Sequence, residues 1–442
     1  MSRAVKFRDL SQLSSSEREA LLLRAEADLD RFLEAVKPII AQVRAKGDQA
    51  LVHFAAEFDR AQIEEDSIKC RPEEFEAALE SLEPEVLEAI RYAGQSIRLF
   101  HERQMPESMR FSEVRPGVFA GDKFSPIPSV ACYVPRGKGS FHSVVLMTSI
   151  PAVVAGVPRV SIVTPPGPDG NVDTATLAAA RIAGVEDVYK CGGAQAVAAV
   201  AYGTQTVPKA HKIVGPGSPW VVAAKRLLAD VIDPGIPAGP SEAIILADRT
   251  APPRVAALDL IIESEHGPDS SAFLVTDSQD LAQAAMRAVP EYWKSMGQTR
   301  VEFSSTVLGS GQGGIILAPD MDQAIDFVND YAPEHLEVLS QEPFKYLGRL
   351  TNAGEILLGP RTPITLGNFV LGPNAVLPTG GAARTFSPLS VYDFVKMTSI
   401  GYVTSGAYDE LARQARILAR YEGFDGHALA VSEARKAALE GQ

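Results

Sequence analysis

Three short stretches of the sequence each place a carboxylate within a few residues of a histidine: Glu263 to His266, Glu334-His335, and Glu422 to His427. In a helix, a glutamate and a histidine three residues apart lie on one face, where both can bind the same metal ion. The same spacing is common on solvated helix faces, so the first stretch alone is weak evidence. Because the chain has only seven histidines, three such stretches suggest one site assembled from distant segments.

The elements that must position these residues follow an α/β pattern. Strands are predicted at 130–135, 160–164, 187–190 and 212–214, and helices at 143–155, 174–183, 194–202 and 219–228. Strands that alternate with helices are typical of a parallel sheet, and glycine-rich turns after such strands are where nucleotides bind. The turns 192–195 and 215–218 are candidates, but neither matches GxGxxG, so tight turns remain the alternative.

Strands near 243–247, 272–276, 314–318 and 355–358 predict a second α/β unit, which includes Glu263 and His266. The N-terminal part is predicted to be helical, from a capping box at residues 16–19 through Phe58 and again from Pro72 to Gln104. Beyond Leu389 the pattern predicts a helical tail, which carries Glu422 and His427.

Composition limits the classes of protein that the chain can belong to. Its 442 residues, 46% hydrophobic and 22% charged, are enough for two or three packed domains. A net charge of -13 argues against nucleic acid as a partner. The longest apolar stretch, Val144 to Val157, is too short to span a membrane, and the N-terminus lacks an apolar signal core, so we expect a cytoplasmic protein. Three distant cysteines predict no disulfide framework: Cys70, Cys132 and Cys191.

Several longer motifs follow one another along the chain: Tyr133-Val134-Pro135, Gly192 to Ala196, Gly215 to Gly217, Ala238 to Glu242, Glu265 to Asp269, Tyr331 to Leu336, and Val376 to Thr379. In this order they resemble the histidinol dehydrogenase family, from about residue 20 to the end. The resemblance implies a homodimer that binds Zn²⁺ and NAD and oxidises a primary alcohol to a carboxylate in two hydride transfers.

In that family a Glu-His pair performs the acid/base chemistry, and the matching residues are Glu334 and His335. The resemblance implies that His335 deprotonates the alcohol and that Glu334 activates the water that hydrates the aldehyde. Without the resemblance, the same residues would read as an exposed helix N-terminus after Pro333.

The family's zinc is held by Gln, His, Asp and a His from the tail of the partner subunit. The matching positions carry Glu263, His266, Asn368 and His427. An amide has become a carboxylate at the first position and a carboxylate an amide at the third, so the charge of the donor set is unchanged. We expect a retained zinc site with exchanged ligands, against the alternative of a decayed site.

Two substrate positions differ from the family. Ile364 stands where a Glu meets the amino group of histidinol, and Ala375 where a His contacts the substrate. An ammonium group facing Ile364 would lose its counter-charge while desolvated, which costs several kcal/mol and disfavours histidinol. Ser241 and Glu422 match further substrate positions and are kept.

The loop from Arg136 to His142 is more basic than the loop usual in the family, and Arg136, Lys138 and His142 predict a small anionic hydroxylated substrate. The subgroup that the chain most resembles is the sulfopropanediol dehydrogenases, which oxidise 2,3-dihydroxypropane-1-sulfonate to sulfolactate. The loop could instead be solvated or neutralise the cofactor pyrophosphate. A true histidinol dehydrogenase and a catalytically silent metal-binding relative are the alternative functions.

Tyr133 and Gln195 match the family's NAD contacts, and Ser218 replaces the usual Asn. A serine still donates and accepts a hydrogen bond at shorter reach, so the preference between NAD and NADP stays open. The expected fold is α/β, with two Rossmann-like parallel-sheet domains and a helical tail in a domain-swapped dimer. The expected parts are an N-terminal helical segment at 1–25, an NAD-binding domain at 126–241, a zinc/substrate domain from 26–125 and 242–388, and a tail at 389–442 that contributes to the partner's active site.

Overall fold

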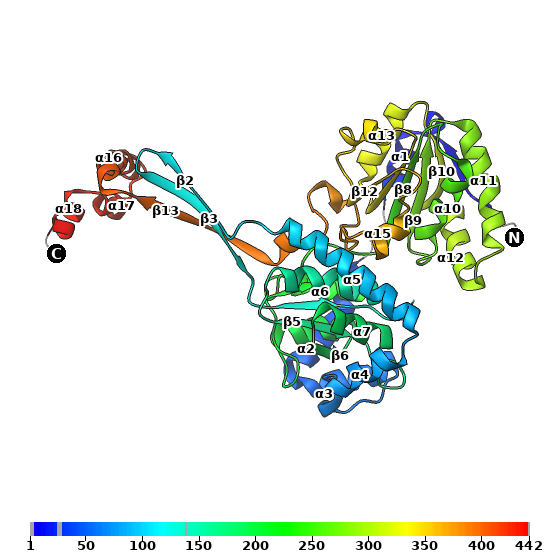
Figure 1. The fold of residues 1–442 in the computed structure, drawn as a ribbon, viewed down its shortest axis with the longest axis horizontal. Helices are drawn as coiled ribbons and strands as arrows, with labels where there is room; N and C mark the ends of the chain where they lie inside the picture. The colour runs from blue at the N-terminus through cyan, green and yellow to red at the C-terminus, as the bar shows by residue number, and fades with distance from the viewer. Residues whose placement is uncertain (1–3, 24–28, 138, 441–442) are drawn as a thin grey trace. The chain divides into compact units, whose positions relative to one another are not determined.

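The computed structural model describes residues 4–23, 29–137 and 139–440, and the chain divides into two compact units. The first unit consists of Met1–Met105 and Ile127–Phe394, and the second of Pro106–Pro126 and Val395–Gln442. Two parallel sheets lie in the first unit, and one antiparallel sheet lies in the second (Figure 1).

The smaller parallel sheet has the strand order β6-β5-β4-β7. Its strands are β4 (Val130–Tyr133), β5 (Val160–Thr164), β6 (Asp187–Lys190) and β7 (Lys212–Val214). The chain moves outward from β4 through β5 to β6 and then returns to the other side of β4. The order therefore reverses between β4 and β7, and the carboxyl ends of strands at such a point are the usual nucleotide-binding position.

Helices cover both faces of this sheet. On one face lie α6 (His142–Val154) and α7 (Thr174–Ala183), and on the other lie α8 (Gly193–Tyr202) and α9 (Pro219–Leu227). All eight predicted strands and helices of this segment are confirmed to within two residues. Local signals explain the accuracy, since the Asp173 carboxylate caps α7 and Gly184, at φ 89°, ends it.

The N-terminal helices form outer layers on the same sheet. They are α2 (Asp30–Lys46), α3 (Asp48–Phe54), the π-helical turn η3 (Ala55–Asp59), α4 (Pro72–Ser81) and α5 (Pro84–Gln104). Helices α2 and α3 pack on α8 and α9, whereas α4 and α5 pack on α6 and α7. This packing differs from the expected grouping of 26–125 with 242–388, because the apolar stripe of α2 is buried against the alanine-rich α8.

The larger parallel sheet has the order β1-β10-β9-β8-β11-β12. Its strands are β1 (Phe7–Asp9), β8 (Glu242–Ala247), β9 (Ser271–Thr276), β10 (Gly313–Leu317), β11 (His335–Leu339) and β12 (Glu355–Leu358). The four predicted strands are confirmed, but β1 and β11 were not predicted. All five residues of β11 are buried, and a fully buried strand usually appears in the sequence as a run of apolar residues. The polar residues of β11 interrupt such a run, which is why the strand was not predicted.

Helices α10 (Pro253–Ser264), α11 (Gln279–Trp293) and α12 (Gln298–Gly309) cover one face of the larger sheet. The other face packs against α1 (Ser15–Leu22), α13 (Met321–Tyr331) and α14 (Phe344–Leu347). Helix α15 (Ile364–Phe369) follows β12. The capping box of α1 is formed by Ser14 and Glu17, two residues earlier than predicted. Short 3-10 turns complete this unit: η1 (Leu10–Gln12), η4 (Glu65–Ser67), η5 (Ala382–Arg384) and η6 (Val391–Asp393).

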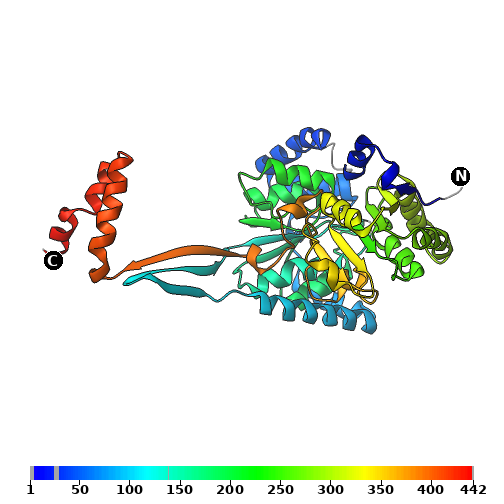
Figure 2. The ribbon, with the colours of Figure 1, turned by 90° about the horizontal axis from the view of Figure 1, so that it is seen from above.

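The second unit is an antiparallel sheet in the order β13-β3-β2, followed by helices (Figure 2). Its elements are β2 (Met109–Arg115), β3 (Val118–Pro126), β13 (Val395–Val403), α16 (Ser405–Tyr421), α17 (Asp425–Ala430) and α18 (Glu433–Glu440). The prediction that the chain is helical beyond Leu389 is therefore wrong up to Thr404. Strand β13 pairs with β3 along its whole length, and aromatic side chains such as Phe119 and Tyr402 meet across the strands.

Two expectations from composition can be compared with the structure. All three cysteines are buried and none forms a disulfide, as predicted. The apolar stretch from Val144 contributes α6, a buried helix of 13 residues with Pro151 inside it. Within the described ranges, no helix is both long enough and apolar enough to cross a membrane.

Candidate active site

The predicted catalytic pair lies at the amino end of β11 and is almost completely buried, with side chains 10% (Glu334) and 4% (His335) exposed. The His335 Nδ1 donates to Glu355 Oε1 at 2.5 Å, and its Nε2 lies 3.8 Å from Glu334 Oε1. The other oxygen of Glu334 accepts the backbone N–H of Glu242 at 2.9 Å. Because His335 starts a strand, the alternative of an exposed helix N-terminus is wrong for this pair.

Burial and neighbouring charge set the protonation of the pair. Burial lowers the pKa of His335, but the carboxylates of Glu334, Glu263 and Glu355 outweigh it and raise that pKa to about 10. Burial is also the main reason that the pKa of Glu334 lies well above its usual value. The site therefore holds more carboxylate than its own imidazole can neutralise, which favours a bound cation.

Three of the four predicted metal ligands converge beside this pair. Glu263 lies in the last turn of α10, and its two carboxylate oxygens meet Asn368 Nδ2 at 3.0 Å and His266 Nδ1 at 3.1 Å. Helix α10 ends at Ser264, so His266 lies just past the helix and does not share a helical face with Glu263. Although burial raises the pKa of Glu263, the charges of His266 and His335 and hydrogen bonds from Asn368 and Ser241 bring it below its usual value.

These donors fit a Zn²⁺ ion with an incomplete shell. The Nδ1 of His266 donates to the Ile262 carbonyl at 3.2 Å, which leaves Nε2 for a metal, and the amide nitrogen of Asn368 is engaged, which leaves its oxygen. The C-terminal end of α10 adds a partial negative charge. No group of three or more His, Cys, Asp or Glu in the described part of the chain could hold a metal, so a further ligand is needed.

The two predicted residues of the tail lie in the second unit. Glu422 follows α16 directly, and His427 lies in α17 with its ring 5.1 Å from that of Phe424. Both side chains are exposed on this unit. Their roles as substrate contact and fourth zinc ligand remain predictions.

The predicted cofactor residues gather at the carboxyl ends of β4, β6 and β7. Tyr133 ends β4, and its hydroxyl accepts the backbone N–H of Gly193 at 3.1 Å. Gln195 is buried in the first turn of α8, and Ser218 caps α9 without a side-chain bond to the helix, so its exposed hydroxyl faces solvent. At Gly215, a Cβ would lie 2.2 Å from the Tyr133 carbonyl, which explains the glycine after β7.

Two residues near this sheet end were not predicted. Lys225 is buried and donates to the Gly215 carbonyl at 2.8 Å, so it fixes the turn after β7. Asp59, at the end of η3, has a buried Oδ2 without a hydrogen-bond partner among the described residues, and burial raises its pKa to about 6. Nothing in the local sequence marks either residue, because only the tertiary packing brings them to the strand ends.

The basic residues of the loop from Arg136 to His142 do not all contact the same part of the protein. Arg136 donates to the Asn171 carbonyl at 2.9 Å, beside the loop after β5. Lys138 lies outside the described residues. His142 begins α6, and its ring stacks 6.5 Å from that of Phe369, the residue after Asn368. Only His142 is thus shown next to the helix that carries a predicted zinc ligand.

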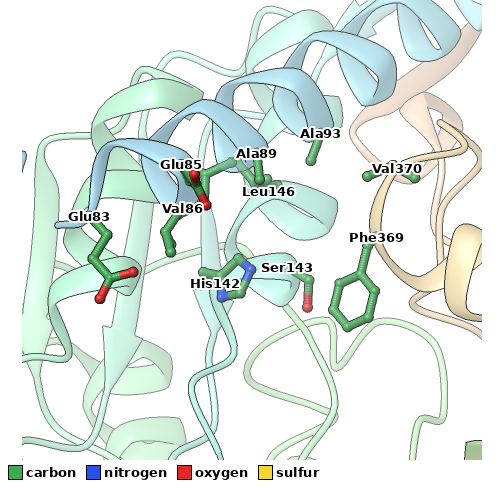
Figure 3. A pocket seen from close by; sticks show the side chains of 11 residues that line it. Glu83, Glu85, Val86, Ala89, Ala93, His142, Ser143, Leu146, Phe369 and Val370 are labelled. Carbon is green, nitrogen blue, oxygen red and sulfur yellow. The ribbon is translucent and has the colours of Figure 1, made fainter.

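His142 and Phe369 line a cavity of about 320 Å³ between α5, α6 and the end of α15 (Figure 3). Most of its wall is apolar, and Glu83 and Glu85 lie at one side. Burial lowers the pKa of His142, and its Nδ1 has no hydrogen-bond partner in the described ranges. The cavity therefore offers a mostly apolar surface near α15, with two acidic residues at one side.

The two altered substrate positions differ in burial. Ile364 is the first residue of α15, and its side chain is completely buried in the core, whereas Ala375 is half-buried. Sequence reasoning missed the acidic residues nearby. Glu355 contacts His335, and Glu337 and Asp259 form a buried pair whose pKa values burial raises to about 10 and about 6. Glu337 lies two residues after His335, so recognition of β11 as a strand would have placed both on one face.

Comparisons with known proteins agree over nearly the whole chain. The family model described as histidinol dehydrogenase matches residues 22–435. A protein named "Histidinol dehydrogenase homolog 2" from Mesorhizobium japonicum is 60% identical over 437 residues, which cover 99% of each chain. Histidinol dehydrogenase from Synechocystis sp. is 46% identical over 433 residues, 98% of this chain and 99% of that protein.

Among solved structures, the crystal structure of histidinol dehydrogenase from Elizabethkingia anophelis is similar with a TM-score of 0.92 and 31% identity, and the match covers 99% of each chain. The similarity in sequence and the similarity in fold thus point to the same family. The chain belongs to the histidinol dehydrogenase family and is an NAD-dependent dehydrogenase of that family.

Proposed function

We propose that the protein is a zinc- and NAD-dependent dehydrogenase that oxidises 2,3-dihydroxypropane-1-sulfonate to sulfolactate in two hydride transfers. The reaction type is supported by the buried cluster of Glu334, His335 and Glu355 beside Glu263. The substrate class rests on one observation: Ile364 is apolar, so this position offers no counter-charge to an amine.

The residues divide the proton chemistry between them. His335 Nε2 accepts the hydroxyl proton while a hydride passes from the carbon to NAD, which gives an aldehyde. Glu334 takes a proton from the water that adds to the aldehyde, which gives the anion of the hydrate. This anion passes a second hydride to a second NAD and becomes the carboxylic acid, which loses its proton to give the carboxylate. Held by Glu263, His266 and Asn368, Zn²⁺ would polarise the substrate oxygen and offset the carboxylates that keep a proton on His335.

NAD would bind at the carboxyl ends of β4 and β7. The Tyr133 hydroxyl, the buried Gln195 amide and the exposed Ser218 hydroxyl are the proposed contacts there, and they come from three different strand ends. The glycine turns at 192–193 and 215–217 let the backbone approach a ligand closely. Arg136 and Lys138 are proposed to add positive charge near the bound NAD, and His142 is proposed to contact the substrate.

The second unit supports a homodimer. Every residue of β2 is exposed, and large apolar side chains are exposed on the sheet and on α16: Met109, Phe111, Val114, Met397, Tyr402, Ile417, Leu418 and Tyr421. Such a surface is typical of an interface with another chain. We propose that a second copy covers it and that His427 and Glu422 complete the partner's site. Deletion of the chain from Asp409 should then abolish zinc binding and weaken the dimer, and full zinc content after deletion would contradict this role of the tail.

Histidinol remains the second candidate substrate, because a histidinol dehydrogenase, from Synechocystis sp., is 46% identical over nearly the whole chain. The deciding experiment follows NADH formation by the zinc-loaded protein with 2,3-dihydroxypropane-1-sulfonate and with histidinol at matched concentrations. We expect a higher kcat/KM for the sulfonate. Faster turnover of histidinol would overturn the proposed substrate, and no NADH with either compound would overturn the proposed reaction.

A further inference from the structure

We infer that Glu355 is a positioning residue that holds the imidazole of His335 in one orientation and one tautomer. The inference rests on the proposed role of His335 as the base. It concerns a residue that no sequence motif in the chain points to.

The contact between the two side chains is short and shielded from solvent. His335 Nδ1 lies 2.5 Å from Glu355 Oε1, and the side chains are 4% and 7% exposed. A carboxylate can only accept a hydrogen bond, so the proton of the neutral imidazole sits on Nδ1. Nε2 is then the nitrogen that is able to accept a proton, and it is the one that faces Glu334.

The backbone fixes both ends of this contact. His335 and Glu355 are register partners at the start of the neighbouring parallel strands β11 and β12. The Glu355 N–H donates to the Glu334 carbonyl at 3.0 Å, and the Gly354 N–H donates to the Pro333 carbonyl at 2.9 Å. The two side chains therefore leave paired strands side by side, and neither depends on a loop for its position.

Helix α15 closes over the carboxylate. At Gly367, a Cβ would lie 3.1 Å from each Glu355 oxygen, which is tighter than most Cβ contacts, so a larger residue there would require the carboxylate to shift. The next residue is Asn368, which contacts Glu263. Glu355 is thus clamped between the base and the helix that carries a predicted zinc ligand, in a geometry with little freedom to rotate.

This arrangement has a chemical consequence. When His335 takes the alcohol proton it becomes an imidazolium, and a carboxylate bonded to Nδ1 stabilises that charge as well as the ring orientation. If Glu355 served only the fold, its removal would lower stability without a selective effect on kcat. The kcat and KM of suitable variants separate the two possibilities.

The test compares Glu355→Ala and Glu355→Gln with Glu337→Gln as a matched control. Glu337 is a buried carboxyl on the same strand as His335, and no hydrogen bond from it to His335 is found in the described ranges. We expect Glu355→Ala to lose about 10²–10⁴-fold in kcat with little change in the KM for substrate and NAD. Glu355→Gln keeps an acceptor for Nδ1, so it should lose less, and Glu337→Gln should keep the kcat of the unmodified protein.

A second readout needs no substrate. In the zinc-loaded protein with ¹⁵N-labelled histidine, a strongly bonded Nδ1 proton gives a low-field NMR signal, which His335→Asn identifies by its loss. We expect Glu355→Ala to lose this signal and Glu337→Gln to keep it. An unchanged kcat, or the signal persisting in Glu355→Ala, would overturn the inference. If histidinol is the better substrate, the proposed substrate fails, and the same kcat comparison with histidinol still tests Glu355.

Discussion

Strands β8 and β11 are neighbours in the larger sheet, and the carboxyl groups at their two ends differ in hydrogen bonding and in the direction of their pKa shifts. At the carboxyl end, Asp248 Oδ2 accepts from Ser340 at 2.6 Å and from Tyr346 at 2.9 Å, and its Oδ1 accepts from Thr250. Burial raises the pKa of Asp248, but these hydrogen bonds outweigh it and lower the pKa to about 2. The chain thus satisfies this carboxylate completely.

At the amino end of the same strands, Glu334 has a pKa well above its usual value because it is buried beside other carboxylates. Only one backbone donor, from Glu242, is seen for it in the described ranges. The difference in hydrogen bonding between Asp248 and Glu334 indicates that a ligand binds at the amino end of these strands. Parallel sheets usually bind ligands at their carboxyl ends, where the predicted cofactor residues of the smaller sheet lie. In the larger sheet Asp248 lies at that end, and the predicted catalytic pair lies at the opposite end.

The largest expected effect comes from Glu334→Gln. Glutamine has nearly the same shape as the Glu334 carboxyl, whose pKa burial raises well above its usual value, so the folded state should unfold at nearly the same temperature. The glutamine cannot take a proton from water, so kcat for carboxylate formation should fall about 10²–10⁴-fold. NADH formation and a thermal melt measure the two quantities. A large loss of stability with normal kcat would show that Glu334 stabilises the fold and does not act in catalysis, as we expect for Asp248 at the carboxyl end.

The next effect concerns the exchanged zinc ligands. Glu263→Gln removes the only carboxylate among the three converging donors, so Zn²⁺ affinity should fall by about 10–100-fold or more. Adding Asn368→Asp returns a carboxylate to the same shell, and the double variant should recover much of the affinity. Titration against a competing chelator measures both. Equal affinity in the unmodified protein and Glu263→Gln would show that Glu263 is not a ligand.

At the other end of the strands, Asp248→Asn should affect stability alone. The amide places N–H donors where Ser340 and Tyr346 already donate, so buried donors lose their acceptor at a cost of about 1–3 kcal/mol. Urea denaturation measures the loss, and kcat should stay unchanged because Asp248 lies at the end of the strands away from His335. A reduced kcat at full stability would remove the distinction between the two ends.

Sequence alone predicted the alternation of the smaller sheet because β4 and β5 are largely apolar and helices such as α7 have local start and stop signals. It failed at β11, where His335 and Glu337 interrupt the apolar pattern of a buried strand. These two polar residues therefore hid the strand from a search for apolar runs. Strand β13 was missed because most of its residues are exposed, so no apolar alternation marks it.

The candidate site shows a similar limit. Motifs identified Glu334, His335, Glu263 and Asn368, and the structure brings these four together. Glu355 escaped although its strand was predicted correctly, because a single glutamate at a strand start carries no motif. Its role appears only once β11 and β12 are paired in register, and pairing between distant strands is not encoded in any local pattern.

The smallest effect sharpens the comparison through pH. Ser340→Ala removes one donor to Asp248 and should cost about 0.5–1.5 kcal/mol at neutral pH. Because the folded pKa of Asp248, about 2, lies below its ordinary value of 3.8, this stabilisation is present above pH 3.8 and is lost as the pH falls toward 2. Urea denaturation at several pH values should therefore show the cost of Ser340→Ala shrinking in that window. Glu337→Gln is the matched control in the acid window. The folded pKa of Glu337 is raised to about 10 and its ordinary value is 4.5, so between about pH 3.8 and 2 its carboxyl is protonated in both the folded and the unfolded state, and its difference from the unmodified protein should be flat there. A cost of Ser340→Ala that does not change with pH would mean that the hydroxyl supports the fold without favouring the ionised carboxylate, and the contrast between the two strand ends would then rest on geometry alone.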